Sequence, residues 1–503
     1  MDLLSNLALG FGVALVPTNL LYAFGGCLLG TLIGVLPGIG PVAAIAMLLP
    51  ATYTLSPVTS LILLAGVYYG AQYGRFTAAI FVTVPGESSS AITCIDGYQM
   101  AHQGRAGRAI VVAGLGSFFA GCVGTLTLAA FAPALAQLAF QFGPAEYFSL
   151  MVLGMVGAVV MASGSLIKAI GMVVLGLLLS LVGTDGYSGL ERFAFDLPEL
   201  ANGISFVALA IGVLVYGAII NNLTQPEIAR TIIATKIYAL WPARKGIRKM
   251  TPAVLRGTAL GSFFGVLPGG GALRASLVSY ALEKRIKSTP GEVSLGQGNI
   301  RGVAAPESAY NAATQTSFIP MLTFGIPLSV GMVLMVGALT IHHIQPGPQV
   351  MTSNPELFWG LIASMCIGNL TLVALNLPLI TVWVKLLSVP YRWLFPAMVL
   401  LCALGVYTTR NSTFDVWLVA AFGFIGYLFN KLDMEPAPLL VGFILGPMME
   451  ENLRQALSSS NGDWGIFVMR PLSAGLMLAA ACALLLVLMP TFKSRRGHVF
   501  VNK

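Results

Sequence analysis

The chain has 503 residues, of which 56% are hydrophobic and only 9% are charged, and its mean hydropathy is +0.84. Soluble domains carry about 25% charged residues, so these values exclude a water-soluble globular protein and make lipid the solvent for much of the chain. The net charge of +8 does not indicate nucleic-acid binding. Its basic residues lie in short loops between apolar runs, which is the positive-inside pattern of polytopic membrane proteins.

One stretch near the N-terminus, residues 30–49 (GTLIGVLPGIGPVAAIAMLL), occurs again at residues 261–280 (GSFFGVLPGGGALRASLVSY). When the two copies are aligned, Leu-Pro-Gly-x-Gly coincides in both, with Gly38 on Gly269 and Gly40 on Gly271. Proline removes a backbone donor and glycine costs helix stability, so a helix cannot pass unbroken. Broken helices at corresponding places in two halves indicate the binding site of a secondary transporter.

The pieces on either side of each break are short. Residues 17–36 and 41–55 flank the first break, and residues 252–267 and 272–286 flank the second. Each piece is at or below the roughly 20 residues that a membrane-spanning helix needs. We therefore predict two re-entrant hairpins whose turns lie at membrane depth, where protein or a water-filled cavity surrounds them. The alternative is two ordinary spans joined by a tight surface turn.

Each half contains a second interrupted segment. Residues 76–94 are broken at Pro85-Gly86, and residues 318–337 are broken at Ile326-Pro327. Hydroxyl residues follow both breaks. At the start of the next helix, free backbone N–H groups and the positive end of the dipole favour anions.

The remaining segments predict the topology. Residues 96–108 form a predicted polar loop, and the basic stretch 226–253 a cytoplasmic linker. With the N-terminus outside and both hairpins returning to the side they entered, five crossings bring the chain to the linker inside. Five more take it out again, so the halves are inverted relative to one another. Arg192, Arg410, Arg454 and Arg470 then lie outside, as exceptions to the charge rule.

We therefore predict an all-α polytopic membrane protein with two inverted-topology repeats, broken helices or re-entrant hairpins, and about 11–12 transmembrane helices. The predicted division has four parts: residues 1–225 form the first transmembrane repeat, 226–253 the basic cytoplasmic linker, 254–450 the second repeat, and 451–503 an extra C-terminal transmembrane helix with a basic tail.

Six motifs, in order over nearly the whole chain, resemble the large membrane subunit (TctA) of tripartite tricarboxylate transporters. The motifs are LPGIGP (36–41), VPGE…DGYQMA…G (84–104), LPGGGALRAS..SY..EK (267–284), GVAAPESAYNAA (302–313), FGIP-S (324–329) and PGP (346–348). The large subunit of TRAP transporters is the alternative, because it shares the three-part organisation. The duplicated LPG-x-G and the APE-x-x-x-N motif favour the tricarboxylate family.

The resemblance implies import of a small organic acid by symport with a cation, H⁺ or Na⁺, across a bacterial inner membrane. It also implies a periplasmic solute-binding protein (TctC-like) and a small membrane subunit (TctB-like) as partners. This sequence departs from the family pattern at several broken segments. It has Tyr73-Gly74-Arg75-Phe76 in place of YGGS, and Thr83-Val84-Pro85-Gly86 in place of N-x-PG. For this reason the resemblance is not extended to a tricarboxylate as substrate.

Backbone N–H and hydroxyl groups at the breaks are the predicted ligands of the substrate carboxylates, around a cavity at the membrane midplane. Glycine allows the backbone to approach a ligand closely. The alternative is that Pro and Gly produce kinks for close helix packing. The predicted substrate-binding residues at the breaks are Gly38, Gly40, Gly269, Gly271, Ser88, Ser89 and Ser329.

Charged residues near the breaks supply two further predictions. Arg75 follows a long apolar run, and a charge at membrane depth is expensive and usually functional, so we predict that it binds a substrate carboxylate. The alternative is an interfacial arginine that reaches toward lipid phosphate. Glu87, Glu307 and Asn311 are the predicted cation-coupling residues, and the residues leave H⁺ and Na⁺ both open. The alternative for Glu307 is capping of the helix that follows Ala305-Pro306.

No other chemistry is indicated. The sequence lacks a spacing of His, Cys or acidic residues that suits a metal site, and it lacks a Walker A motif. No nucleophile–base pair is apparent, so we expect a transporter without a cofactor rather than an enzyme. A membrane channel, which lacks coupling to an ion gradient, is the remaining alternative class.

Overall fold

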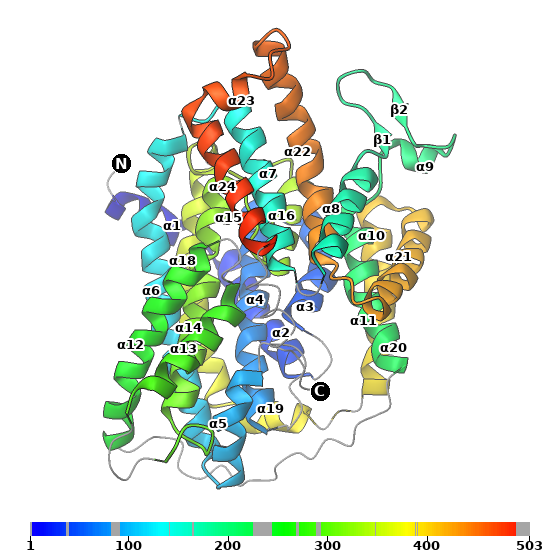
Figure 1. The fold of residues 1–503 in the computed structure, drawn as a ribbon. Helices are drawn as coiled ribbons and strands as arrows, with labels where there is room; N and C mark the ends of the chain where they lie inside the picture. Colours follow the sequence, from blue (N-terminus) through cyan, green and yellow to red (C-terminus); the bar gives the residue numbers. More distant parts are fainter. Residues whose placement is uncertain are drawn as a thin grey trace. The chain divides into compact units, whose positions relative to one another are not determined.

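The computed structural model is helical almost throughout the part of the chain that it describes, with one pair of two-residue antiparallel strands, β1 (Gly183–Thr184) and β2 (Glu191–Arg192) (Figure 1). The prediction of an all-helical membrane protein is thereby confirmed. The described residues are 3–36, 40–81, 91–139, 141–162, 165–224, 244–267, 271–287, 293–347, 349–387, 389 and 391–488.

Six of the described helical stretches are long and apolar enough to cross a membrane, which makes this a multi-pass membrane protein. Further apolar helices are shorter, including Leu3–Ala14, Pro41–Thr54 and Val330–Ile341. The inverted relation of the two halves stays a prediction. The six long stretches are Pro17–Val35, Ala106–Phe131, Phe206–Thr224, Pro355–Asn376, Trp393–Arg410 and Thr413–Lys431.

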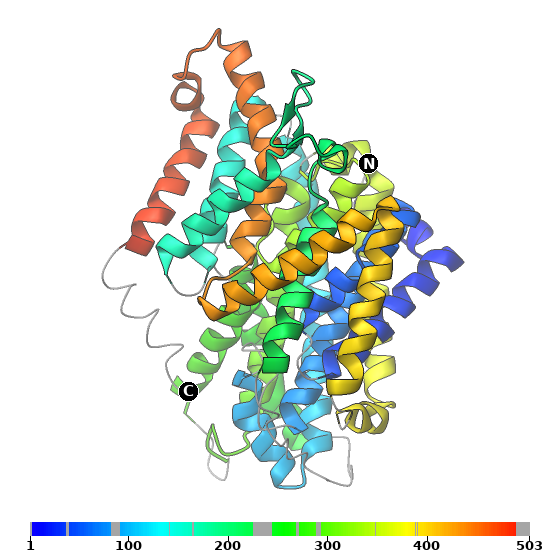
Figure 2. The ribbon, with the colours of Figure 1, turned by 90° about the vertical axis from the view of Figure 1, so that its right-hand side faces the viewer.

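The chain forms two compact units, each built from segments of both predicted repeats. Figure 2 shows the helices from a second side, in the sequence colours of Figure 1. Unit 1 comprises residues 1–133, 225–319 and 350–400, and unit 2 comprises residues 134–224, 320–349 and 401–503. The division into repeats at residues 1–225 and 254–450 is a separate prediction and remains one.

Unit 1 contains both copies of the repeated stretch, residues 30–49 and 261–280. Its elements are α1 (Leu3–Ala14), α2 (Pro17–Val35), α3 (Pro41–Leu48), the 3₁₀ turn η1 (Pro50–Thr54), α4 (Pro57–Phe81), α5 (Ala91–His102), α12 (Arg244–Val266), α13 (Gly271–Arg285), α14 (Arg301–Thr316), α18 (Pro355–Asn376) and α19 (Ile380–Leu386). Four helices have residues in both units, namely α6 (Ala106–Ala139), α15 (Phe318–Phe324), α17 (Gln349–Ser353) and α20 (Tyr391–Arg410).

In unit 2, α22 packs against both α7 and α8. Helix α21 packs against the π-helical turn η3 and against α11, which follows it. Its elements are α7 (Pro144–Met161), α8 (Leu166–Ser180), the strands β1 and β2, α9 (Pro198–Ala201), α10 (Phe206–Ala210), the π-helical turn η3 (Ile211–Tyr216), α11 (Gly217–Thr224), α16 (Val330–Ile341), α21 (Thr413–Lys431), α22 (Ala437–Ser459), α23 (Ile466–Met469) and α24 (Pro471–Leu488).

Glycines at four-residue spacing bring α2 and α4 into backbone contact. A Cβ atom at Gly30 would overlap the carbonyl oxygen of Val67, and one at Gly34 would overlap that of Ala71. Only a residue without a side chain fits there, as in other close pairs of membrane helices. The same arrangement recurs in the second half, where glycines of α12 meet alanines of α14. These contacts join Gly257 to Ala305, Gly261 to Ala309 and Gly265 to Ala313.

The order of these contacts fixes the direction of the helices. Along α2 and α4 the contacting residue numbers rise together, and they do so again along α12 and α14, so each pair is parallel. The chain must therefore return between the two members of each pair. In the first half α3 and η1 lie on the return path, and in the second half α13 does. The turns at residues 37–39 and 268–270 lie outside the described residues, so their depth in the membrane stays a prediction.

Several predicted boundaries are wrong. Residues 96–108 are not one loop, because α5 continues to His102 and α6 begins at Ala106. The second hairpin does not begin at residue 252, because Pro252 lies inside α12, which begins at Arg244 within the predicted linker. The break at Ile326-Pro327 is present between Phe324 and Val330.

The glycine contact predicts a stability difference between two positions on one helix. Gly30→Val forces a side chain into the backbone of α4, and overpacking of this kind costs about 1–3 kcal/mol or more. Gly25→Val is the matched control, because nothing lies within 4 Å of a Cβ at that position. Thermal unfolding of the purified protein should show a clear drop for Gly30→Val and little change for Gly25→Val. Equal drops for both variants would contradict the packing described here.

Candidate substrate and ion site

The candidate site begins with Arg75, whose side chain is only 3% exposed within α4. Nearly every residue of this helix is buried, and its composition is apolar on most faces. A buried guanidinium is costly unless it has a counter-charge. The alternative of an arginine that reaches toward lipid phosphate is therefore wrong, because Arg75 is directed into the protein.

The counter-charge is Glu307 of α14, whose side chain is 1% exposed. The Arg75 Nη2 atom lies 3.0 Å from Glu307 Oε2 and 3.3 Å from Glu307 Oε1. The Thr93 hydroxyl of α5 donates a further hydrogen bond to Glu307 Oε1. Three helices from both halves of the chain thus meet at one carboxylate. Arg75 and Glu307, which the sequence predicted for substrate and cation respectively, are direct partners.

Two further residues of α14 complete this group. The Arg75 Cζ atom lies 3.9 Å from the centre of the Tyr310 ring, in a cation–π contact. The Asn311 Nδ2 atom donates to the Ser117 hydroxyl at 2.7 Å and to the Glu307 carbonyl at 3.0 Å. Because residues three and four apart share one helix face, Glu307, Tyr310 and Asn311 form one polar stripe.

The capping alternative for Glu307 is wrong. The helix begins at Arg301, and Pro306 lies inside it, so Glu307 is beyond the first turn where capping side chains act. Its carboxylate instead lies in the ion pair with Arg75. Proline is common at the first position of a helix, so the sequence suggested a helix that begins after Ala305-Pro306. The helix in fact begins at Arg301.

A second buried carboxylate, Asp96, fixes the position of α5. Its Oδ1 atom accepts hydrogen bonds from the backbone N–H groups of Gly296, Gly298 and Asn299 at 2.9, 2.9 and 2.7 Å. Its Oδ2 atom accepts from the Tyr280 hydroxyl at 2.9 Å. Gly296 and Gly298 have φ angles of +91° and +95°, which other residues rarely adopt.

The Asp96 contact supports the ion pair from one helical turn away. It joins α5 to the loop that leads into α14, and Thr93 lies three residues before Asp96 on the same helix. The Thr93 hydroxyl is thereby held in register with Glu307. Asp96, Thr93 and Tyr310 were not predicted from the sequence as parts of this site. The only signals were an acidic residue in DGYQMA and the glycines of GQGN, which are far apart in the sequence.

The remaining predicted residues are two glycines at helix starts in unit 1, one serine in unit 2, and five residues outside the described part of the chain. Gly40 precedes α3 in an extended conformation, and Gly271 opens α13 with a φ of +59°. Ser329 caps α16 in unit 2, where its hydroxyl accepts from the Met332 N–H at 3.3 Å. These three remain predicted ligands of the substrate. The residues that lie outside the described part of the chain are Gly38, Gly269, Ser88, Ser89 and Glu87.

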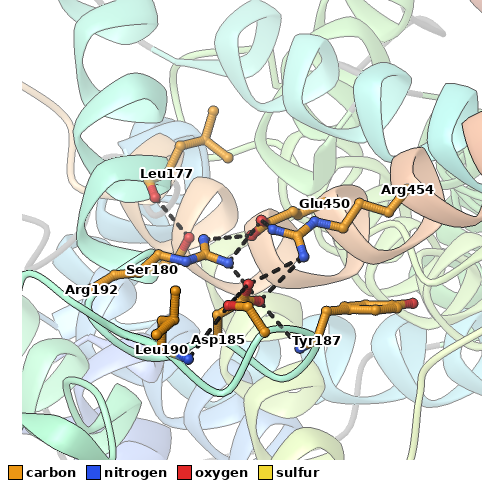
Figure 3. A network of polar contacts seen from close by, with 9 residues as sticks. Leu177, Ser180, Asp185, Tyr187, Leu190, Arg192, Glu450 and Arg454 are labelled. Carbon is orange, nitrogen blue, oxygen red and sulfur yellow. Dashed lines mark hydrogen bonds and ion pairs between the residues drawn. The ribbon is translucent and has the colours of Figure 1, made fainter. Parts of the chain in front are cut away.

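Unit 2 holds a separate polar network, shown in Figure 3. Asp185 lies 2.6 Å from Arg192 and 3.2 Å from Arg454, and Glu450 lies 3.1 Å from Arg192 and 2.6 Å from Arg454. The hydrogen bond from Arg192 holds the pKa of Asp185 well below its usual range. The network attaches the β1–β2 hairpin to α22, and it explains two basic residues on the predicted outer side, since each has acidic partners.

These observations define the class of protein. A buried pair of Arg and Glu inside a multi-pass membrane protein whose helices are interrupted in both halves is the arrangement expected of a solute transporter.

The comparisons identify its family. The model of the tripartite tricarboxylate transporter TctA family matches residues 20–441, so the chain belongs to this family of transporters. It is 54% identical over its full length, and the full length of the relative, to an uncharacterized 52.8 kDa protein in the TAR-I ttuC' 3'region of Agrobacterium vitis. It is 53% identical, over 48% of this chain and 99% of the relative, to an uncharacterized protein in the TAR-II ttuC' 3'region of the same organism. No solved structure matches the chain.

The ion pair predicts a non-additive effect on stability. Glu307→Gln leaves the Arg75 guanidinium buried without a counter-charge, and breaking a buried pair in this way costs about 3–5 kcal/mol. The double variant Arg75→Gln/Glu307→Gln removes both charges and should recover part of that loss. Thermal unfolding of Arg75→Gln, Glu307→Gln and the double variant measures the coupling. Additive losses would show that the two groups do not interact.

The Asp185 network predicts that the β1–β2 hairpin, and not the rest of the protein, loosens from α22 when Asp185 loses its charge. Because the pKa of Asp185 is lowered in the folded protein, its contribution is present above the unfolded pKa near 3.8 and is lost as the pH falls through the folded value. Asp185→Asn removes the charge at every pH, so it should weaken the attachment of the hairpin to α22 at neutral pH. Hydrogen–deuterium exchange should then increase in residues 183–192 and not in α4. Unchanged exchange in the hairpin would argue against the network.

Proposed function

We propose that this chain is the large permease subunit of a solute-binding-protein-dependent secondary transporter, which imports a small organic carboxylate by symport with H⁺ or Na⁺. The observation that carries the proposal is the buried pair of Arg75 and Glu307, at 3.0 Å. The pair supports the proposal because a guanidinium has the chemistry to bind a carboxylate and a carboxylate has the chemistry to bind a cation.

The pair supplies a coupling mechanism. A substrate carboxylate has the same chemistry as the Glu307 side chain, so the two compete for the Arg75 guanidinium. When the substrate displaces Glu307, the released carboxylate is left in a low-dielectric site. It then needs a proton or a sodium ion, because an isolated buried charge is costly. Anion binding and cation binding therefore favour one another.

The broken helices contribute the rest of the proposed site. Gly40 and Gly271 each begin the returning helix of a hairpin, and backbone N–H groups at such ends favour anions. We assign a second substrate carboxylate to these ends, together with Gly38, Gly269, Ser88, Ser89 and Ser329. Glu87 and Asn311 are assigned to the coupling cation with Glu307.

The proposed setting follows from the family. Its name denotes a tripartite system, so we assign as partners a periplasmic solute-binding protein and a small membrane subunit, in a bacterial inner membrane. The binding protein delivers the substrate to the outer side of the permease, and ion gradients drive accumulation.

The test is uptake of a radiolabelled carboxylate by vesicles that contain the complete three-part system. Arg75→Gln should abolish binding and uptake. Glu307→Gln leaves Arg75 available, so exchange of labelled for unlabelled substrate should persist while accumulation driven by an ion gradient is lost.

Thr314→Val is the matched control on α14, because its hydroxyl donates only to the Tyr310 carbonyl of its own helix, at 2.9 Å. It should transport normally. Gradient-driven accumulation by Glu307→Gln at the wild-type level would contradict the coupling mechanism. Flux that never exceeds equilibrium in the wild type would indicate a channel.

A further inference from the structure

We propose that Gln72 is a substrate-binding residue of the same site, and that its amide recognises a hydroxyl group of the substrate close to the carboxylate bound by Arg75. The inference rests on the proposed function and narrows the substrate to hydroxylated organic acids.

The first observation is an amide without partners. Gln72 is 1% exposed, and neither its Oε1 atom nor its Nε2 atom has a hydrogen-bond partner in the described part of the chain. The great majority of buried side-chain polar atoms in proteins are hydrogen-bonded, and one left unpaired is costly. A buried glutamine whose amide has no partner at either end among the described residues is therefore expected to have a partner that binds from outside the protein.

The second observation is its position. Gln72 lies three residues before Arg75 and four after Tyr68 on α4, which places all three on one face. Arg75 contacts the Tyr310 ring of α14, and the Tyr68 ring lies 6.5 Å from that of Phe318. Along α4, Gln72 thus lies between Tyr68, which packs near Phe318, and Arg75, which contacts Tyr310.

Tyr69, adjacent to Tyr68, adds a further polar atom to this region. Its ring lies 5.8 Å from that of Phe318, and its hydroxyl likewise lacks a hydrogen-bond partner among the described residues. Two buried groups with unmet hydrogen-bonding capacity therefore occur within one helical turn of each other, beside the ion pair.

The chemistry of an amide selects the ligand group. A guanidinium only donates hydrogen bonds and an ionised carboxylate only accepts them, whereas an amide offers N–H donors and a carbonyl acceptor. A substrate carboxylate would satisfy the N–H end of Gln72 and leave its oxygen unpaired. A hydroxyl group can donate to the Gln72 oxygen, which neither an ionised carboxylate nor the Arg75 guanidinium can pair with in the presence of the acid. The Cβ atoms of residues three apart on a helix lie about 5–6 Å from each other, which suits neighbouring groups of one small acid.

The experiment compares acids that differ by one hydroxyl group, with the complete three-part system in vesicles. The probes are succinate with malate, and tricarballylate with citrate. The variants are Gln72→Leu and Gln72→Met, with Thr77→Val as the matched control, because the Thr77 hydroxyl donates to the Tyr73 carbonyl of its own helix at 3.2 Å. Since one binding protein serves every variant, the ratio of variant to wild-type uptake reports the permease.

We expect both Gln72 variants to reduce uptake of the hydroxylated acid by on the order of 10-fold, and to change uptake of its partner acid much less. Their melting temperatures should be equal to or above that of the wild type, because an apolar side chain replaces an unpaired amide. Thr77→Val should transport both acids normally.

Three results would overturn the inference. They are unchanged uptake of all four acids by both variants, an equal loss for both members of a pair, and a lowered melting temperature that shows the amide to be bonded within the protein. Wild-type uptake of succinate and tricarballylate but of neither hydroxylated acid would also overturn the inference, whereas wild-type flux that never exceeds equilibrium would contradict the proposed function.

Discussion

The cost of an unpaired charge in a membrane protein governs this structure. Arg75 is buried in an apolar helix, so its guanidinium requires a counter-charge at all times. In the structure Glu307 supplies it, and the Tyr310 ring covers the guanidinium. In the mechanism that we propose, a substrate anion replaces Glu307 without leaving Arg75 unpaired, but it then leaves Glu307 in need of a cation. In that mechanism, the electrostatic constraint that stabilises the ion pair also links the substrate to the coupling cation.

The surrounding structure holds this pair in place through other buried charges. Asp96 joins α5 to the loop before α14, and it does so through backbone N–H groups that only glycine-rich geometry presents. At the other side of that loop, Glu283 is fully buried between Arg256 and Arg301, at 2.7 Å from each. Because Arg256 belongs to α12, Glu283 to α13 and Arg301 to α14, these two ion pairs hold the three helices together. The close parallel pairing through glycines adds a rigid backbone framework in both halves.

The sequence predicted the parts of the site that have a local signal. Pro-Gly breaks, a charge after an apolar run and a carboxylate beside a proline are all visible within a few residues, and they selected Arg75 and Glu307. The pairing of these two residues was not predictable, because they are 232 positions apart. Asp96 was assigned to a loop because its polar neighbours resemble one, whereas tertiary contacts make it part of a buried helix. The proline inside α12 and the one inside α14 misplaced helix starts for the same reason, since packing overrode local preference.

The proposed coupling requires that a substrate carboxylate takes the place of Glu307 on Arg75. Infrared difference spectroscopy of the purified permease with ¹³C-labelled glutamate measures this directly, with Glu307→Gln to assign the band. The account predicts that substrate addition removes the Glu307 carboxylate band if a proton is taken up, or shifts it if sodium binds. A Glu307 band that is unchanged when substrate binds would contradict the account.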